Sequence, residues 1–77
     1  MTVKVLFFGV LAEVTGTSCR YYSDARSIDD LRIMIVDDFP EIVHYNFRIS
    51  VNNEITDNGR QLIDRDEIAL LPPFAGG

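Results

Sequence analysis

One segment of this 77-residue chain has the length and spacing of a long helix, and short strand-like segments lie on both sides of it. Its apolar positions recur every three or four residues, at Ile28, Leu31, Ile35 and Phe39. Ser27 has the features of a helix N-cap, because Asp30 follows three residues later and places negative charge in the first turn. Pro40 is expected to end the helix, since a proline disfavours helical angles in the preceding residue. The sequence therefore predicts one main helix with one face turned towards a core.

The other apolar segments are short and rich in β-branched and aromatic residues, which is typical of strands. The predicted strands span residues 3–8, 17–22, 47–51, 54–56 and 67–71. Residues 10–14 fit a short helical turn or a loop, and Asn52-Asn53 suits a turn because asparagine tolerates positive φ. The short connection between the first two strands favours antiparallel pairing. This order predicts an α+β fold, with a mixed sheet packed on one main helix in a single domain of residues 1–77.

The composition limits how this domain can be stabilised. An apolar fraction of 47% argues against disorder, although 77 residues lie near the lower limit for a self-sufficient core. Cys19 is the only cysteine, so no internal disulfide can form, and one cysteine with one histidine is too few for a structural zinc site. We therefore expect no metal, a stabilising hydrophobic core and a reducing compartment.

The net charge of −5 bears on the partners of the protein. It disfavours nucleic acid, whose phosphates are recognised by basic surfaces. It favours a partner with a basic face, although the same charge can also serve solubility alone.

The apolar run of residues 5–12 near the start raises the question of a signal peptide or a membrane segment. Only Lys4 precedes the run as a basic residue, no cleavage site of the A-x-A type follows it, and Glu13 ends it. The run is also too short to span a membrane. The sequence therefore predicts a soluble cytoplasmic protein that does not associate with membranes.

The last eight residues form an unusual ending for a strand. Pro72 and Pro73 directly follow the apolar strand and stop it, because proline has no N–H and a fixed φ. Gly76 and Gly77 have no side chain that would obstruct a narrow passage, and four extended residues reach roughly 13 Å. We therefore interpret residues 72–77 as a flexible tail and place the chemistry on the C-terminal carboxyl of Gly77. The alternative is a frayed chain end without function.

This order of elements and this tail resemble the ubiquitin-like β-grasp fold. The chain is most similar to the small subunit of molybdopterin synthase, the MoaD-type sulfur carriers, and it matches them at residues 4–8, 51–53 and 62–77. The sulfur carriers of the thiamine pathway share the fold and the terminal Gly-Gly but usually lack Pro-Pro. One departure is Arg65, where the family often has glycine. An arginine at that position implies a turn of different geometry.

The resemblance implies a carrier without catalytic residues or a bound cofactor. An E1-like enzyme that uses ATP with Mg²⁺ would adenylate Gly77, and sulfur from a sulfurtransferase would then replace AMP to leave a thiocarboxylate. The large synthase subunit, expected in a heterotetramer, would bind the tail and transfer the sulfur to a pterin precursor of the molybdenum cofactor. Gly76, Ala75 and Phe74 would then lie inside that partner.

Strand alternation predicts where partners bind. If Lys4 and Glu67 face solvent, then every second residue after them does so as well, and the resemblance places the two strands side by side. Apolar residues occupy those positions, and one more follows the turn after the middle strand: Leu6, Phe8, Ala69, Leu71 and Ile55. An exposed apolar patch of this kind usually marks an interface. The alternative is that Leu6 or Phe8 packs under a loop.

Three rival functions follow from other features. Cys19 and His44 are the residue types of a thiol nucleophile and its base, although a lone cysteine is more often a packing residue. The tail also fits a ubiquitin-like modifier that is joined to other proteins through Gly77. The third rival function is that of a protein-interaction domain whose tail has no role of its own.

Overall fold

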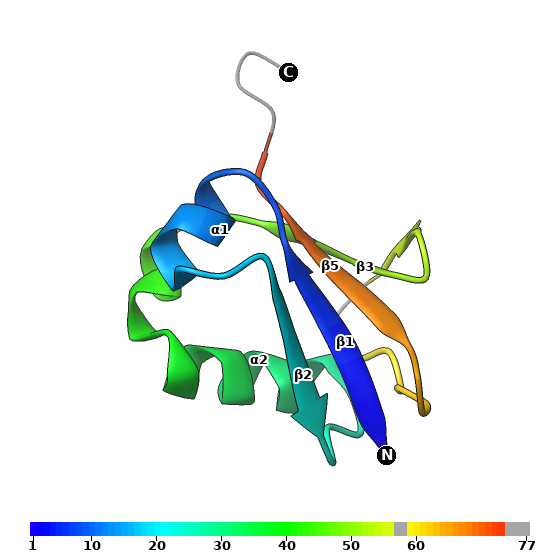
Figure 1. Ribbon diagram of the computed structural model, residues 1–77. Coiled ribbons are helices and arrows are strands. Elements are labelled where there is room, and N and C mark those ends of the chain that lie inside the picture. The colour runs from blue at the N-terminus through cyan, green and yellow to red at the C-terminus, as the bar shows by residue number, and fades with distance from the viewer. Residues whose placement is uncertain (57–58, 74–77) are drawn as a thin grey trace.

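The computed structural model describes residues 1–56 and 59–73 and contains two α-helices, a 3₁₀-helix and five strands within them (Figure 1). In chain order these elements are β1 Thr2–Phe7, α1 Val10–Thr15, β2 Cys19–Ser23, α2 Ile28–Asp38, η1 Pro40–His44, β3 Arg48–Val51, β4 Glu54–Ile55 and β5 Glu67–Leu71. Among these residues, no helix is long and apolar enough to cross a bilayer.

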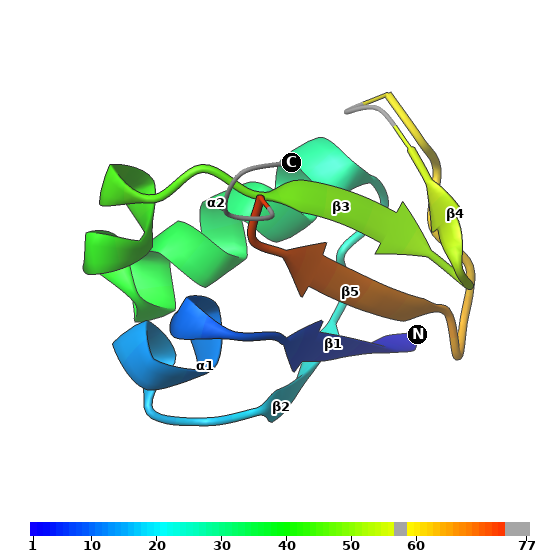
Figure 2. The ribbon, with the colours of Figure 1, turned by 90° about the horizontal axis from the view of Figure 1, so that it is seen from above.

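The strands form one mixed sheet in the order β2-β1-β5-β3-β4. The first and last strands, β1 and β5, pair in parallel, and every other pair is antiparallel, including the predicted pair of β1 and β2. Helix α2 packs on one face of the sheet (Figure 2). The predicted α+β architecture, a mixed sheet on one main helix, is confirmed.

The core lies between the sheet and α2. Every second side chain of β1 and β5 points into it, and the helix contributes the residues spaced three and four apart that the sequence predicted. These buried residues are Val3, Val5, Phe7, Ile68 and Leu70 from the strands and Ile28, Leu31 and Ile35 from α2. Burial of one such side chain stabilises a fold by about 1.5–3 kcal/mol.

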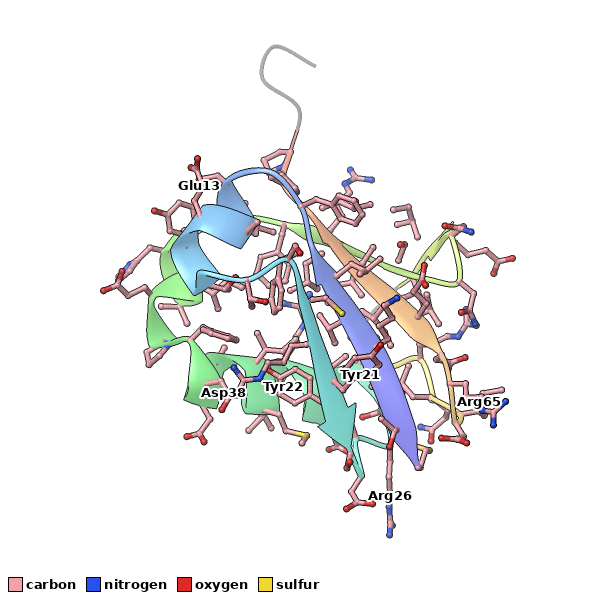
Figure 3. The ribbon with its side chains drawn as sticks, viewed as in Figure 1. Glu13, Tyr21, Tyr22, Arg26, Asp38 and Arg65 are labelled. Carbon is pink, nitrogen blue, oxygen red and sulfur yellow. The ribbon has the colours of Figure 1, made fainter. Side chains whose placement is uncertain are left out.

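Helix α2 begins and ends as its sequence indicates. The Ser27 hydroxyl oxygen accepts a hydrogen bond from the Asp30 N–H at 3.2 Å, which is an N-cap. At the other end Asp37 and Asp38 oppose the helix dipole, and Arg20 of β2 reduces this effect through an ion pair with Asp38 at 3.5 Å. Figure 3 shows Tyr22 beside this end of α2. Burial, together with the neighbouring Asp38 carboxylate, raises the pKa of the Tyr22 hydroxyl.

Element boundaries differ from the prediction where side chains bond locally to the backbone. Strand β2 begins at Cys19 rather than residue 17. The Thr17 hydroxyl donates to the Cys19 carbonyl at 2.9 Å and accepts from the Cys19 N–H at 3.3 Å, which forms a turn before the strand. Of the two alternatives for residues 10–14, a short helical turn or a loop, the structure has the helical one, since they lie in the six-residue helix α1.

The expectation of a different turn at Arg65 is wrong. Arg65 has a φ of 69°, which is the left-handed region that glycine favours, so the turn keeps that geometry with a bulkier residue. Hydrogen bonds hold it there. The Arg65 N–H donates to the Thr2 carbonyl at 2.8 Å, and the Thr2 N–H donates to the Asp64 carboxylate at 2.8 Å, which lowers the pKa of Asp64.

The same turn is fixed from inside by Asp66, a buried acidic residue. Its carboxylate accepts hydrogen bonds from the Ile63 N–H at 2.8 Å and from the Asn52 side-chain amide at 2.9 Å. Asn52 and Asn53 have positive φ values of 50° and 72°, as the turn prediction required. The hairpin between β3 and β4 is thereby tied to the start of β5.

We expect Arg65→Gly to stabilise the protein by about 0.5–1 kcal/mol. Glycine removes the left-handed cost of about 1–2 kcal/mol, and the greater freedom of the unfolded chain offsets part of this gain. The control is Arg65→Ala, which removes the guanidinium group but keeps the β-carbon, and it should give no gain. Urea unfolding measures both variants. Equal stability of the two variants would show that the backbone is not strained at Arg65.

Candidate functional site

The chain leaves the sheet from its middle strand. Strand β5 lies between β1 and β3, and its last residues pair with the end of β1, as Phe7 opposite Leu70 shows. The Phe8 N–H donates to the Leu70 carbonyl at 3.2 Å, so this contact continues one residue beyond β1. The root of the tail, Pro72-Pro73, therefore lies at the α1 end of the sheet, opposite the N-terminus (Figure 1).

Gly9 allows Pro72 of the tail root to pack closely against the chain that follows β1. Its φ of 56° and ψ of −132° lie in a region that essentially only glycine adopts. A β-carbon at Gly9 would also stand 3.0 Å from the Pro72 Cγ atom. Gly9 therefore serves two purposes, since it turns the chain into α1 and leaves room for Pro72. The predicted first strand ends at residue 8, directly before this glycine, and nothing near it in the chain indicates a contact with Pro72.

Several predicted site residues fall outside the part of the chain that the structure describes. These are the tail residues Phe74, Ala75, Gly76 and Gly77. The predicted roles of the tail residues therefore stay predictions.

The predicted patch residues come together on the outer face of the sheet, the face away from α2. Strand register places Leu6 beside Ala69, Ala69 beside Ser50, and Ser50 beside Ile55. Residues opposed in register on neighbouring strands point to the same face, so one row of side chains crosses four strands. Cys19 opposes Leu6 on β2 and extends the row across the whole sheet.

A second group lies nearer the tail root. Leu71 opposes Arg48, and Phe8 follows directly after β1. Phe8 is 44% exposed and Ile55 is 57% exposed. Three further members are half-buried, namely Leu6, Ala69 and Leu71. We name these five residues, Leu6, Phe8, Ile55, Ala69 and Leu71, the sheet patch.

Ser50 is buried, although it lies on the outer face of the sheet. It is only 5% exposed, because it lies between β4 and β5 with Ile55 and Ala69 as in-register neighbours. Alternation along β3 places Ser50 and Arg48 on the outer face, so the side of the sheet on which they lie can be inferred from the sequence. The position of Cys19 beside Leu6 depends on the register of β1 and β2, which the sequence does not specify.

The structure does not bring together the residues of a thiol enzyme. Cys19 is half-buried on β2, His44 is exposed at the end of η1, and no hydrogen bond joins them. Within residues 1–56 and 59–73, no group of three His, Cys, Asp or Glu side chains is arranged to hold a metal ion.

Comparison with known proteins adds to this geometry. The profile of the ThiS family matches residues 5–77. A chain from the complex of subunits 1 and 2 of the molybdopterin-converting factor of Helicobacter pylori is 30% identical, with a TM-score of 0.75 and 100% coverage of both chains. Small archaeal modifier protein 1 from Methanosarcina acetivorans is 26% identical, with a TM-score of 0.83 and coverage of 99% of this chain and 96% of that one.

Small archaeal modifier protein 1 (SAMP1) from Haloferax volcanii is 22% identical, with a TM-score of 0.88 and 100% coverage of both chains. At this identity the likeness concerns the fold alone. Together with the profile match, it confirms the ubiquitin-like β-grasp fold that the sequence analysis expected.

We expect Gly9→Ala to lower the free energy of unfolding by about 1–3 kcal/mol, because alanine is strained at this backbone conformation and its β-carbon meets Pro72. Gly16→Ala is the matched control. Gly16 also has a positive φ, of 75°, but has no atom within 4 Å of the added carbon, so about 1 kcal/mol should be lost. Urea unfolding compares the two variants, and equal losses would contradict a role for the Pro72 contact.

Proposed function

Since the chain belongs to the ThiS family, whose members are small non-catalytic sulfur carriers, we propose that it is the small subunit of a molybdopterin synthase. In this role Gly77 would carry sulfur as a thiocarboxylate and donate it to the pterin precursor of the molybdenum cofactor. The relative from Helicobacter pylori supports this choice, because it is 30% identical over its full length and was solved with subunit 2 of the molybdopterin-converting factor.

The observation that carries the proposal is the position of the sheet patch beside the tail root. Leu71 is the last residue of β5, and Phe8 lies next to it at the same end of the sheet. A partner that covers this apolar surface would hold Pro72 in place, so that the following residues enter an adjacent active site. Burial of about 800 Å² on each partner is usual for a stable interface.

The chemistry requires activation of the carboxyl group by another protein. A carboxylate resists nucleophiles because of its charge, and its oxygen is a poor leaving group. In the adenylate, formed from ATP with release of pyrophosphate, the charge is masked and AMP can leave. A persulfide on the sulfur donor then displaces AMP from the carbonyl carbon of Gly77, and a second thiol of that donor cleaves the resulting S–S bond, which leaves a thiocarboxylate on Gly77 and a disulfide on the donor. The partner's site would shelter the resulting thiocarboxylate from water.

The partners follow from this division of labour. We propose an E1-like enzyme that uses ATP with Mg²⁺, a sulfurtransferase as the sulfur donor, and the large synthase subunit in a heterotetramer. The carrier itself would bind no cofactor and supply no catalytic side chain. Its folded part would position the carboxyl group, and each partner would supply the catalytic groups.

A second candidate function is that of a ubiquitin-like modifier. The small archaeal modifier protein from Methanosarcina acetivorans, 26% identical to this chain, supports it. In that case the activated Gly77 would be attacked by a lysine amine of another protein rather than by sulfur. Sulfur carriage in the thiamine pathway is the third candidate, and Pro72-Pro73 argues against it, because those carriers usually lack this pair.

The first test is the intact mass of the protein purified from cells that carry the pathway. We expect a fraction of the protein to be heavier by the difference between one sulfur and one oxygen atom, and fragmentation should place the change on Gly77. Deletion of Gly77 should abolish the heavier species and cofactor synthesis. High-mass adducts that vanish with the deletion, with no sulfur-bearing species, would instead support the modifier function.

The second test addresses the sheet patch. We expect Phe8→Asp to weaken binding to the large synthase subunit about 30-fold or more, since a central aromatic contact is commonly worth 2 kcal/mol or more. The fold should be retained because Phe8 is 44% exposed. Calorimetric titration measures the affinity.

The matched control for Phe8→Asp is Ile63→Asp. Ile63 is 68% exposed and precedes β5, at the end of that strand away from the tail root. This substitution introduces the same charge on an exposed apolar residue outside the sheet patch, so the affinity should remain within about twofold. Equal effects of the two substitutions would exclude the sheet patch as the binding surface.

A further inference from the structure

Helix α2 has a second apolar surface, on the side facing solvent. Ile33 is 70% exposed and Val36 is 37% exposed, although neither belongs to the core face. Ile33 lies four residues from Asp29 and four from Asp37, so these three exposed side chains form one row along the helix. Each step of the row is about 6 Å. An apolar side chain is thus flanked by a carboxylate on either side.

A cavity lies beside this row. It has a volume of about 100 Å³, comparable to one medium-sized apolar side chain, and is lined mostly by apolar side chains of α2 and of the segment leading through β3, including Leu31, Phe47 and Ile49. Arg32 and Val36 line this cavity and also a shallow hollow that contains Ile33. The two depressions therefore adjoin along the ridge formed by Arg32 and Val36.

The negative charge of the protein is concentrated on α2 and the adjoining η1. Residues 28–44 contain five acidic residues, Asp29, Asp30, Asp37, Asp38 and Glu41, and one basic residue, Arg32, which gives −4 of the total net charge of −5. The rest of the chain is nearly neutral. The outer sheet face carries Lys4, Glu67 and Arg48 around the sheet patch and so has little net charge, which makes the two faces of the molecule differ in charge.

We propose that the solvent face of α2 is a second docking surface, which binds a basic amphipathic helix of a partner protein. We name this surface the helix patch and define it by Asp29, Ile33, Val36, Asp37 and Phe47. An apolar side chain of the partner covers Ile33, lysines or arginines four residues before and after it meet Asp29 and Asp37, and a second apolar side chain enters the cavity beside Phe47.

Charge selects this occupant over others. A second copy of the chain docked through the same face would bring the carboxylates of one row against those of the other, because such an interface pairs identical surfaces. An anionic membrane or a nucleic acid would likewise meet the exposed carboxylates of Asp29 and Asp37. A partner with basic residues is attracted instead, and this attraction also raises the association rate.

The helix patch does not depend on the proposed function. It lies on α2, on the opposite side of the sheet from the sheet patch (Figure 2). A partner on α2 leaves Leu6, Phe8 and the tail root uncovered. The two surfaces can therefore be occupied together, and either one can fail its test without the other.

The test is an NMR titration of the full ¹⁵N-labelled chain with a synthetic helical peptide. The peptide has one leucine flanked at four residues on each side by lysines, and a second leucine on the adjacent ridge. We expect saturable shifts of Ile33, Val36 and Phe47. The affinity should fall about tenfold as the ionic strength rises to about 0.5 M, because exposed charges are screened over a few ångströms at that concentration. An isomeric peptide with its lysines on the opposite face should bind at least tenfold more weakly.

Variants of the protein separate specific docking from general attraction. Asp37→Lys should weaken peptide binding at least fivefold while the fold is retained, because a basic residue suits the last turn of a helix. Ile33→Ser should weaken it to a similar extent. Glu67→Lys changes the net charge equally on the outer sheet face and should leave the affinity within twofold, as should Phe8→Asp.

Two results would overturn the proposal. One is the absence of shifts at Ile33 and Phe47 up to about millimolar peptide, or shifts centred on the sheet patch, which means that the helix patch does not bind the probe. The other is an equal loss of affinity in Glu67→Lys and Asp37→Lys, which means that only the net charge attracts the peptide.

Discussion

The structure depends on the position of β5 between β1 and β3. Its parallel register with β1 places Ile68 beside Val5, and its antiparallel register with β3 places Ile68 beside Val51. All three side chains are fully buried, so β5 cannot shift without exposing the core. Because side chains alternate with a period of two, the same register turns Ala69 and Leu71 to the outer face. One constraint therefore fixes both the core and the sheet patch.

Because β5 has a neighbouring strand on each side, the segment that follows it leaves the sheet along the strand axis. The pairing of β5 ends at Leu71, and proline at the next position has no N–H with which to extend the ladder. The chain that follows β1 must turn aside at this point to leave room. Gly9 makes that turn with a conformation that other residues rarely adopt, and the contact between Gly9 and Pro72 defines where the tail begins. The site is therefore built by two segments that lie more than sixty residues apart in sequence.

The sequence predicted those features that depend on local periodicity. The apolar spacing of α2, the Ser27 cap and the limits of β5 needed no tertiary information. Features that arise from contacts between distant segments were either not predicted or predicted incorrectly. Arg65 adopts a left-handed conformation because backbone bonds from residue 2 hold its turn, and local propensity gives no hint of this. For the candidate site, alternation predicted which residues of each strand face outwards, and the resemblance placed the two strands side by side, whereas the role of Gly9 required a contact across the fold.

The two proposed docking surfaces would attract partners by different physical means. The sheet patch is apolar and lies beside Lys4, Glu67 and Arg48, so it has little net charge of its own. Its affinity must come from burial of apolar surface and from shape, which act only at contact. The region around α2 carries most of the negative charge and acts over about 10 Å in dilute salt. A basic partner is therefore drawn towards α2 before contact, while a partner for the sheet patch is selected after contact. In the proposed roles, this separation would allow a small domain to present the tail to one protein while another is bound on the opposite side of the sheet.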